Sequence, residues 1–370
     1  MSYGGSMERL GNSPVSKNSY AELHLHLGGA ITPRMLWHTH QAENGVLTAA
    51  SKFKIVPING HLKDGTPITF KTYEQFQRFF YKNKKNLNDY LEMHHVVEPL
   101  QRKNKLAYYA SRMMRAAFEF ENLSYIEIRH TPWGRTDKTK SFEERVQEMR
   151  EIVTILHDTF KEQKLNYPIT VKQILCLHSQ YTPEINQAIF DLCKEMSKEG
   201  KVCGLDIAGG ETKYSPVFIK QMIKYFEEAH EIEGLFTTAH IFETRNTPEA
   251  MFDLLPFLNR IGHGIMIPLR YKKRLSELAE RGICLEICPT TYIQCSTFKN
   301  YYDKGFREIF KACDDEGVDI VIGTDNGGMH GVRLQAEFEN LLIHEVISHK
   351  QFHQYRLNAF KHAFTPRFNR

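Results

Sequence analysis

Eight short segments rich in β-branched and apolar residues recur along this chain, and longer segments with helical periodicity separate them. Strands that alternate with helices indicate βαβ units and a parallel sheet. Eight such units are the number that closes a (β/α)8 barrel of the TIM type. The pattern therefore predicts an α/β barrel with strands at 21–27, 124–129, 169–177, 202–208, 235–240, 260–264, 283–288 and 319–324.

Apolar residues spaced three to four apart predict the barrel's helices at 142–161, 183–199, 216–231, 248–258, 271–281, 334–348 and 352–364. We expect one barrel over 20–370, preceded by a flexible leader at 1–19 that is rich in Gly, Ser and Asn and lacks a signal-peptide core. The connection after the first strand is much longer than the rest and predicts a helical insertion at about 34–122. Its aromatic residues either form an apolar lid over the barrel mouth or fill a core between helices. They include Tyr73, Phe76, Phe79 and Phe80.

Composition excludes several classes of partner. The 370 residues are 41% hydrophobic and 25% charged, as in ordinary globular proteins. A net charge of +4 does not indicate a nucleic-acid footprint, and no apolar run reaches the length of a membrane-spanning helix. Seven irregularly spaced cysteines without a secretory signal favour the reducing cytoplasm, with Cys284 and Cys288 as buried thiols. We expect a small-molecule substrate, and the oligomeric state stays open.

Histidines gather at the ends of predicted strands. His24 and His26 alternate with leucines, so both point to one face of the first strand and can converge on one ion. The carboxyl ends of all strands meet at the active-site face of such a barrel. Imidazole and carboxylate together suit Zn²⁺, with Fe²⁺, Mn²⁺ or Co²⁺ as poorer choices. Three further ionisable residues end other predicted strands, namely His240, His263 and Asp325.

Glu243 follows His240 by three residues and can stand beside a metal to move protons. A zinc-activated water with such a carboxylate suits hydrolysis at an electrophilic carbon, although spacing alone does not identify the substrate. The sequence has neither a G-x-S-x-G elbow nor a P-loop, and it lacks the zinc signature of cytidine deaminases. Nucleophilic alternatives are therefore poorly supported.

Taken together, these motifs resemble the adenosine deaminase family of metal-dependent amidohydrolase barrels. The matching stretches follow the family's order from about residue 20 to the end. The resemblance implies hydrolytic deamination of an adenine nucleoside or 5′-nucleotide to the inosine product and ammonia. The stretches are AELHLHLGGAITP (21–33), YIEIRHTP (125–132), GLDIAGGE (204–211), AHIFE (239–243), RIGHGI (260–265), LEICPT (285–290) and GTDNGGM (323–329).

The resemblance also implies roles for single residues. Glu243 would protonate purine N1, which makes C6 electrophilic, and His263 would orient and deprotonate the attacking water. The backbone amide of Gly209 would meet purine N3. The implied ligands of one zinc ion are His24, His26, His240 and Asp325.

Three departures from the family pattern affect the predicted substrate. Gly28 replaces an aspartate that contacts the ribose 5′-hydroxyl, and Asn326 replaces an aspartate at purine N7, where an amide can still donate. Ile241 and Phe242 are bulky where the family has small residues, which predicts a reshaped cavity wall. Because Gly28 removes a negative charge and frees volume, we hypothesise a larger 5′ group such as a phosphate or polyphosphate. The candidate cationic partners are Arg34, Arg135, Lys213, Arg270 and Arg333.

The sequence is also compatible with two other functions. Loss of the sugar contact at Gly28 leaves room for a deaminase of free adenine, a modified purine or another amino-heterocycle. A non-catalytic binding protein on the same barrel is the remote alternative, since every ligand and proton-transfer position is filled.

Overall fold

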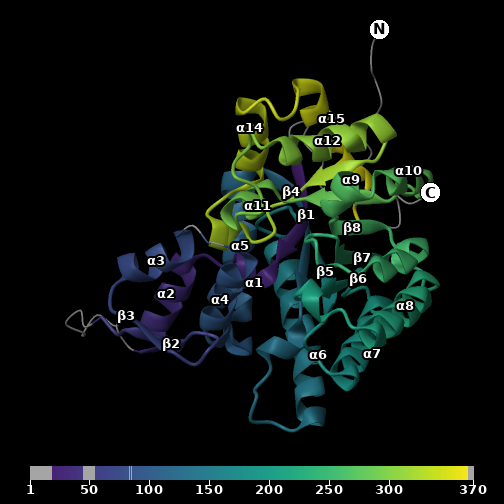
Figure 1. Ribbon diagram of the computed structural model, residues 1–370. Helices are drawn as coiled ribbons and strands as arrows, with labels where there is room; N and C mark the ends of the chain where they lie inside the picture. The colour runs from purple at the N-terminus through teal and green to yellow at the C-terminus, as the bar shows by residue number, and fades with distance from the viewer. Residues whose placement is uncertain (1–18, 45–54, 83, 85, 366–370) are drawn as a thin grey trace.

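The computed structural model describes residues 19–44, 55–82, 84 and 86–365, so nearly all of the predicted leader lies outside the described residues. Eight parallel strands hydrogen-bond side by side around a barrel, which confirms the predicted fold class (Figure 1). In sheet order they are β1 (Tyr20–His26), β4 (Leu123–His130), β5 (Thr170–His178), β6 (Gly204–Ala208), β7 (Phe236–Ile241), β8 (Arg260–His263), β9 (Cys284–Ile287) and β10 (Ile320–Ile322).

The barrel closes where β1 meets the residues that follow β10. Leu25 and Asp325 form a parallel bridge there. The backbone N–H of His26 donates to the carbonyl of Asp325 at 2.7 Å, and the N–H of Asp325 donates to the carbonyl of His24 at 2.8 Å. Closure of the barrel therefore brings His24 and His26, which lie early in the chain, close to Asp325, which lies late in it.

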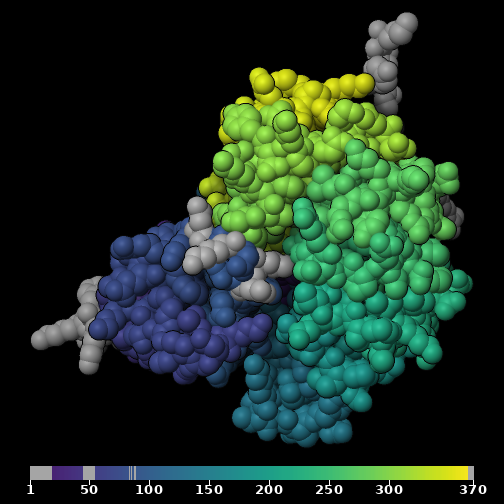
Figure 2. All heavy atoms as spheres, in the orientation of Figure 1, coloured from purple at the N-terminus to yellow at the C-terminus, as the bar shows by residue number. Residues whose placement is uncertain are grey.

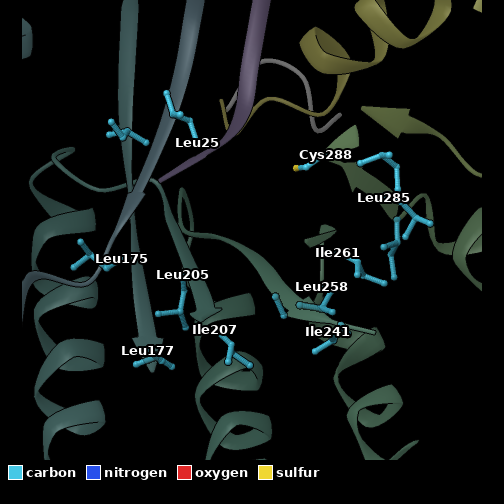
Figure 3. Close-up of a cluster of buried hydrophobic side chains, with 14 of the residues drawn as sticks. Leu25, Leu175, Leu177, Leu205, Ile207, Ile241, Leu258, Ile261, Leu285 and Cys288 are labelled. Carbon is cyan, nitrogen blue, oxygen red and sulfur yellow. The ribbon is translucent and has the colours of Figure 1, made fainter. Parts of the chain in front are cut away.

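Helices cover the outside of the barrel and pack on the apolar faces of the strands. Figure 3 shows this cluster, in which Leu175 and Leu177 of β5 lie near Leu205 and Ile207 of β6. Several helices begin at a Ser or Thr cap, which fixes where each one leaves its loop. The longer helices around the barrel are α6 (Phe142–Gln163), α7 (Pro183–Lys198), α8 (Pro216–His230), α10 (Leu275–Arg281), α12 (Lys304–Glu316), α14 (Leu334–Ile343) and α15 (His349–Lys361).

Short helical turns occupy many of the loops. The helix predicted at 248–258 is a 3₁₀ helix, η5 (Glu249–Phe257), and Pro256 inside it cannot supply the N–H of a continuing α-helix. The other short elements are α1 (Leu27–Ala30), α9 (Met266–Arg270), α11 (Pro289–Gln294), α13 (Gly327–His330), η1 (Glu98–Leu100), η2 (Lys103–Lys105), η3 (Pro132–Arg135), η4 (Glu211–Lys213) and η6 (Lys272–Arg274).

The long connection after β1 forms a lobe beside the barrel (Figure 2). It is not wholly helical as expected, because β2 and β3 form an antiparallel hairpin whose turn contains Gly65 at φ 88°. Phe76 and Phe80 are fully buried with Trp37, so they fill the lobe's core instead of forming a lid. The elements are α2 (Pro33–Glu43), β2 (Ile58–His61), β3 (Pro67–Phe70), α3 (Tyr73–Tyr81), α4 (Leu87–Val97) and α5 (Leu106–Glu121). Among the described residues, no helix is long and apolar enough to cross a membrane.

Candidate metal centre and active site

Four side chains converge at the carboxyl ends of the strands. His24, His26, His240 and Asp325 each contribute one donor atom, and these atoms all lie within 4.8 Å of one another. The Nε2 atom of His26 lies 3.1 Å from Nε2 of His240 and 3.3 Å from Oδ1 of Asp325. The Nε2 atom of His24 is buried without a hydrogen-bond partner. Three imidazoles and one carboxylate at this spacing, with an orphaned buried nitrogen among them, fit a metal ion such as Zn²⁺.

The backbone positions these donors. The period of β1 places His24 and His26 on the inner face two residues apart, as the sequence predicts. Asp325 lies three residues after the end of β10 and has a φ of 58°, a conformation that aspartate tolerates better than most residues. This turn lets the chain form the closing bridge with β1 while its carboxylate joins the histidines.

Two buried carboxylates hold the outer nitrogens of the ligand histidines. Glu286 Oε2 lies 2.6 Å from Nδ1 of His24, and Asp206 Oδ1 lies 3.1 Å from Nδ1 of His240. Arg129 donates to both carboxylates, at 2.8 Å to Glu286 and 2.9 Å to Asp206. A carboxylate at Nδ1 keeps the proton there and leaves Nε2 free as a ligand atom.

The same network extends down the inside of the barrel. Arg260 donates to Glu286 at 2.6 Å and also pairs with Glu127, and all of these side chains are fully buried. Burial opposes ionisation of Glu286, yet Arg129 and Arg260 hold its pKa well below the usual range. This network was not predicted from the sequence. Its signal is a charged residue within a mostly apolar strand, as with Arg129 of β4, Asp206 of β6 and Glu286 of β9.

Burial also sets the protonation of the histidines. It lowers the pKa of His24 to about 3 and that of His26 well below its ordinary value, which leaves both rings neutral. A neutral imidazole is the form that ligates metal. Cys288, interpreted from the sequence as a buried thiol, is fully buried beside this cluster.

Glu243 and His263 face each other across the cluster. Glu243 Oε2 lies 3.9 Å from Nε2 of His263, whose Nδ1 lies 3.0 Å from the hydroxyl of Tyr292. Burial raises the pKa of Glu243 to about 8, with the charges of Glu211 and Asp325 adding to the effect. The Glu243 carboxyl is therefore mostly protonated at neutral pH and can donate a proton, while burial keeps His263 neutral and able to accept one.

The loop after β7 turns Glu243 toward this cluster. Glu211 accepts the backbone N–H of Glu243 at 3.0 Å and that of Thr244 at 2.7 Å. Phe242 has a φ of 57° and stacks on Phe252, with ring centroids 4.1 Å apart. Phe242 and its neighbour Ile241 are buried in the outer core and do not line the cavity, so the expected reshaping of the wall is not seen.

A cavity of about 270 Å³ joins the predicted site residues. Gly209 lines it with a φ of 99°, and a side chain there would lie 2.5 Å from Ser179 Oγ. Asn326 also lines the cavity and packs against Gly29. The Oδ1 atom of Asn326 is buried and has no hydrogen-bond partner among the described residues. All nine sequence-predicted site residues come together, since eight line the cavity and His24 lies beneath it. The eight are His26, Gly28, Gly209, His240, Glu243, His263, Asp325 and Asn326.

Only one of the five predicted cationic partners lies at this cavity. Arg135 lines its wall beside Gly28. The other four are exposed side chains that do not line it, namely Arg34, Lys213, Arg270 and Arg333.

An eight-stranded barrel with this cluster at its strand ends has the architecture of a metal-dependent hydrolase. The chain belongs to the adenosine deaminase family, whose model matches residues 20–370, and it is a deaminase. An adenosine deaminase of Clostridium acetobutylicum is 26% identical over 323 residues, which cover 86% of this chain and 85% of that protein.

Two solved structures are similar in fold. An amidohydrolase from Burkholderia ambifaria with bound Zn has a TM-score of 0.71 and 19% identity, covering 94% of this chain and 86% of that one. Arabidopsis ADAL complexed with IMP has a TM-score of 0.69 and 18% identity, covering 94% and 93%.

Proposed function

We propose that this protein catalyses the zinc-dependent hydrolytic deamination of an adenine nucleoside or 5′-nucleotide, releasing the inosine product and ammonia. One observation carries the proposal. A four-donor cluster that fits a metal ion shares one cavity with the Glu243 carboxyl group, whose pKa burial raises to about 8, and with the His263 imidazole, whose pKa burial lowers. The family supports the deamination, and the similar structures with Zn and with IMP support the metal and the purine class.

The metal would be held by His24, His26, His240 and Asp325, with Glu286 and Asp206 orienting two of the rings. Bound Zn²⁺ lowers the pKa of a coordinated water toward about 7. The protein's own contribution is to aim three imidazoles at one buried point and to keep those of His24 and His26 neutral, because burial lowers their pKa values.

Two side chains move protons during the reaction. Glu243 donates its proton to ring nitrogen N1, which withdraws electron density from C6. His263 accepts a proton from the water that attacks C6 and passes it to the amino group, so that the C6–N bond breaks and ammonia leaves. The proton left on the new C6 hydroxyl returns to Glu243 as the carbonyl of the product forms. The Gly209 backbone and the Asn326 amide hold the ring, because an amide N–H can donate to an aromatic nitrogen without first being protonated.

Because the seven cysteines are free and buried, which suits a reducing compartment, we propose that this enzyme is cytoplasmic.

Ammonia release from adenosine, AMP, ADP, ATP and adenine, measured side by side on zinc-loaded protein, tests the proposal. We expect turnover of the nucleoside or a nucleotide, and near-absence of turnover in Glu243→Gln prepared identically. Preferred turnover of free adenine selects the first alternative. Absence of ammonia from every compound, with Glu243→Ala indistinguishable from wild type, supports the non-catalytic binding protein.

A further inference from the structure

Two guanidinium groups line the cavity, and they differ in how they are neutralised. Arg129 is paired with Asp206 and Glu286. Arg135, in η3 after β4, has no carboxylate within 4.0 Å among the described residues, and its Nε is buried without a hydrogen-bond partner. Its other nitrogens donate only to neutral oxygens, at 3.2 Å to the carbonyl of Thr131 and 3.3 Å to Gln101 Oε1. Arg135 is therefore a cavity-lining cation with unused donor capacity.

Arg135 and Gln101 pack directly against Gly28, because residue 28 has no side chain. A Cβ at Gly28 would lie 3.1 Å from Nη2 of Arg135 and 3.0 Å from Oε1 of Gln101. Gly28 stands two residues after the metal-site His26, a stretch of at most about 7 Å of chain. The guanidinium therefore lies in the same cavity as the metal cluster, beside a residue that closely follows one of its ligands in the chain. A carboxylate at residue 28 would pair with Arg135.

A second hollow of about 320 Å³ shares part of its lining with this cavity, including Gly134, the residue before Arg135. Lys63, Lys138 and Arg145 line this second hollow. Glu98, whose charge acts on Arg135, pairs with Lys138 at 3.4 Å and so is partly neutralised. Positive charge accordingly exceeds negative charge along this second hollow, where an anionic end of the substrate would be attracted.

We propose that Arg135 binds the 5′-phosphate of the substrate, so that the preferred substrate is a 5′-phosphorylated adenine nucleotide and not adenosine or adenine. This inference rests on the deamination proposed above and assigns the substrate class of the same cavity. A planar guanidinium matches the geometry of phosphate oxygens and can donate to two of them at once. Gln101 accepts from Nη2 and so orients the guanidinium, and Gly28 places no carboxylate beside it.

The test compares kcat/KM for AMP and adenosine in wild type and Arg135→Ala. Wild type should prefer AMP, and removing a buried charge partner should lower the AMP-to-adenosine ratio by roughly 30-fold or more, mainly through KM. Arg135→Lys should recover part of that ratio because it keeps the charge. Arg34→Ala removes an exposed arginine outside the cavity and serves as the matched control, with the wild-type ratio.

Substitutions at residue 28 separate the effect of an added negative charge from the effect of added side-chain volume. Gly28→Asp should lower the AMP-to-adenosine ratio because its carboxylate would neutralise Arg135, whereas Gly28→Ala adds volume without charge and should change it far less. A wild-type preference for adenosine, or equal losses for both substrates in folded Arg135→Ala, overturns the inference while deamination still stands.

Calorimetric binding of IMP and inosine gives a readout that does not depend on turnover. We expect IMP to bind wild type more tightly than inosine does, and Arg135→Ala to remove the difference. If no purine is deaminated but IMP binding still depends on Arg135, the deamination proposal fails and the phosphate site stands. Inhibition by inorganic phosphate at equal strength in wild type and Arg135→Ala would show that phosphate binds elsewhere, which contradicts the assignment.

Discussion

Oε2 of Glu286 lies 2.6 Å from Nδ1 of His24, so the innermost imidazole of the metal cluster stands directly on a carboxylate of the barrel interior. The same carboxylate accepts hydrogen bonds from Arg129 and Arg260. Glu286 therefore orients a predicted metal ligand and also balances the charge of two arginines in the barrel core.

Glu286→Gln should weaken the metal site and the fold together. Losing the carboxylate that orients a ligand histidine typically lowers metal affinity about 10- to 100-fold. Two buried arginines also lose part of their counter-charge, so the free energy of unfolding should fall by about 3–5 kcal/mol. Zinc competition with a chelating dye and urea unfolding of the metal-free protein measure the two effects. Unchanged zinc affinity in the folded variant would argue against the orienting role.

Glu243→Gln should retain zinc and lose activity. The amide keeps the size of the side chain but has no acidic proton for N1, and loss of an essential general acid costs roughly 10²–10⁴-fold in kcat. Mass spectrometry measures whether the variant retains zinc, and ammonia release from AMP measures its remaining activity. Near-normal turnover in this variant would remove Glu243 from the proton-transfer step.

Gly29→Ala should reduce substrate binding by displacing Asn326. A Cβ at residue 29 would lie 1.9 Å from Oδ1 of Asn326, so the amide must move away from its present position. We expect kcat/KM to fall about tenfold, the cost of one hydrogen bond to the ring, with zinc content unchanged. Asn326→Ala should cause a similar loss, and the double variant should lose no more than either single variant. Fully additive losses would show that the two positions act separately.

Asp319→Asn should destabilise the junction between α15 and the barrel in a pH-dependent way. The Asp319 carboxylate lies 2.7 Å from His362 Nε2 and 2.6 Å from Lys361 Nζ, and these partners lower its pKa from 3.8 to about 2. A folded-state pKa below the unfolded one means stability that is present above about pH 4 and lost as the pH falls toward 2.

Urea unfolding at neutral pH should therefore show wild type more stable than Asp319→Asn by about 2 kcal/mol. The gap should narrow in unfolding measured near pH 3. A gap that is independent of pH would mean that packing, and not charge, accounts for the difference.

Much of the fold follows from local patterns in the sequence. Strand positions are predictable because apolar and inward-facing residues alternate, and His24 and His26 share a face for that reason. Asp325 was predictable beside them because a closed parallel barrel brings all carboxyl strand ends to one face. The hairpin of β2 and β3 was missed, since short strands in an exposed lobe carry little apolar periodicity.

Features that depend on contacts distant in sequence could not be predicted. Five cations follow predicted strand ends, but only the packing of Gln101 and Gly28 around Arg135 shows which one lines the cavity. Likewise, the pairing of Arg129 with Glu286 joins residues 157 positions apart, so no local pattern reveals it.

Stepwise addition of zinc to the metal-free protein, with ammonia release from AMP and adenosine followed at each step, tests the central claim most directly. We expect activity to rise in proportion to zinc and to stop at one ion per chain, while Asp325→Ala neither retains zinc nor gains activity. Full activity in the metal-free protein, or full zinc-dependent activity in Asp325→Ala, would contradict a metal centre built from His24, His26, His240 and Asp325.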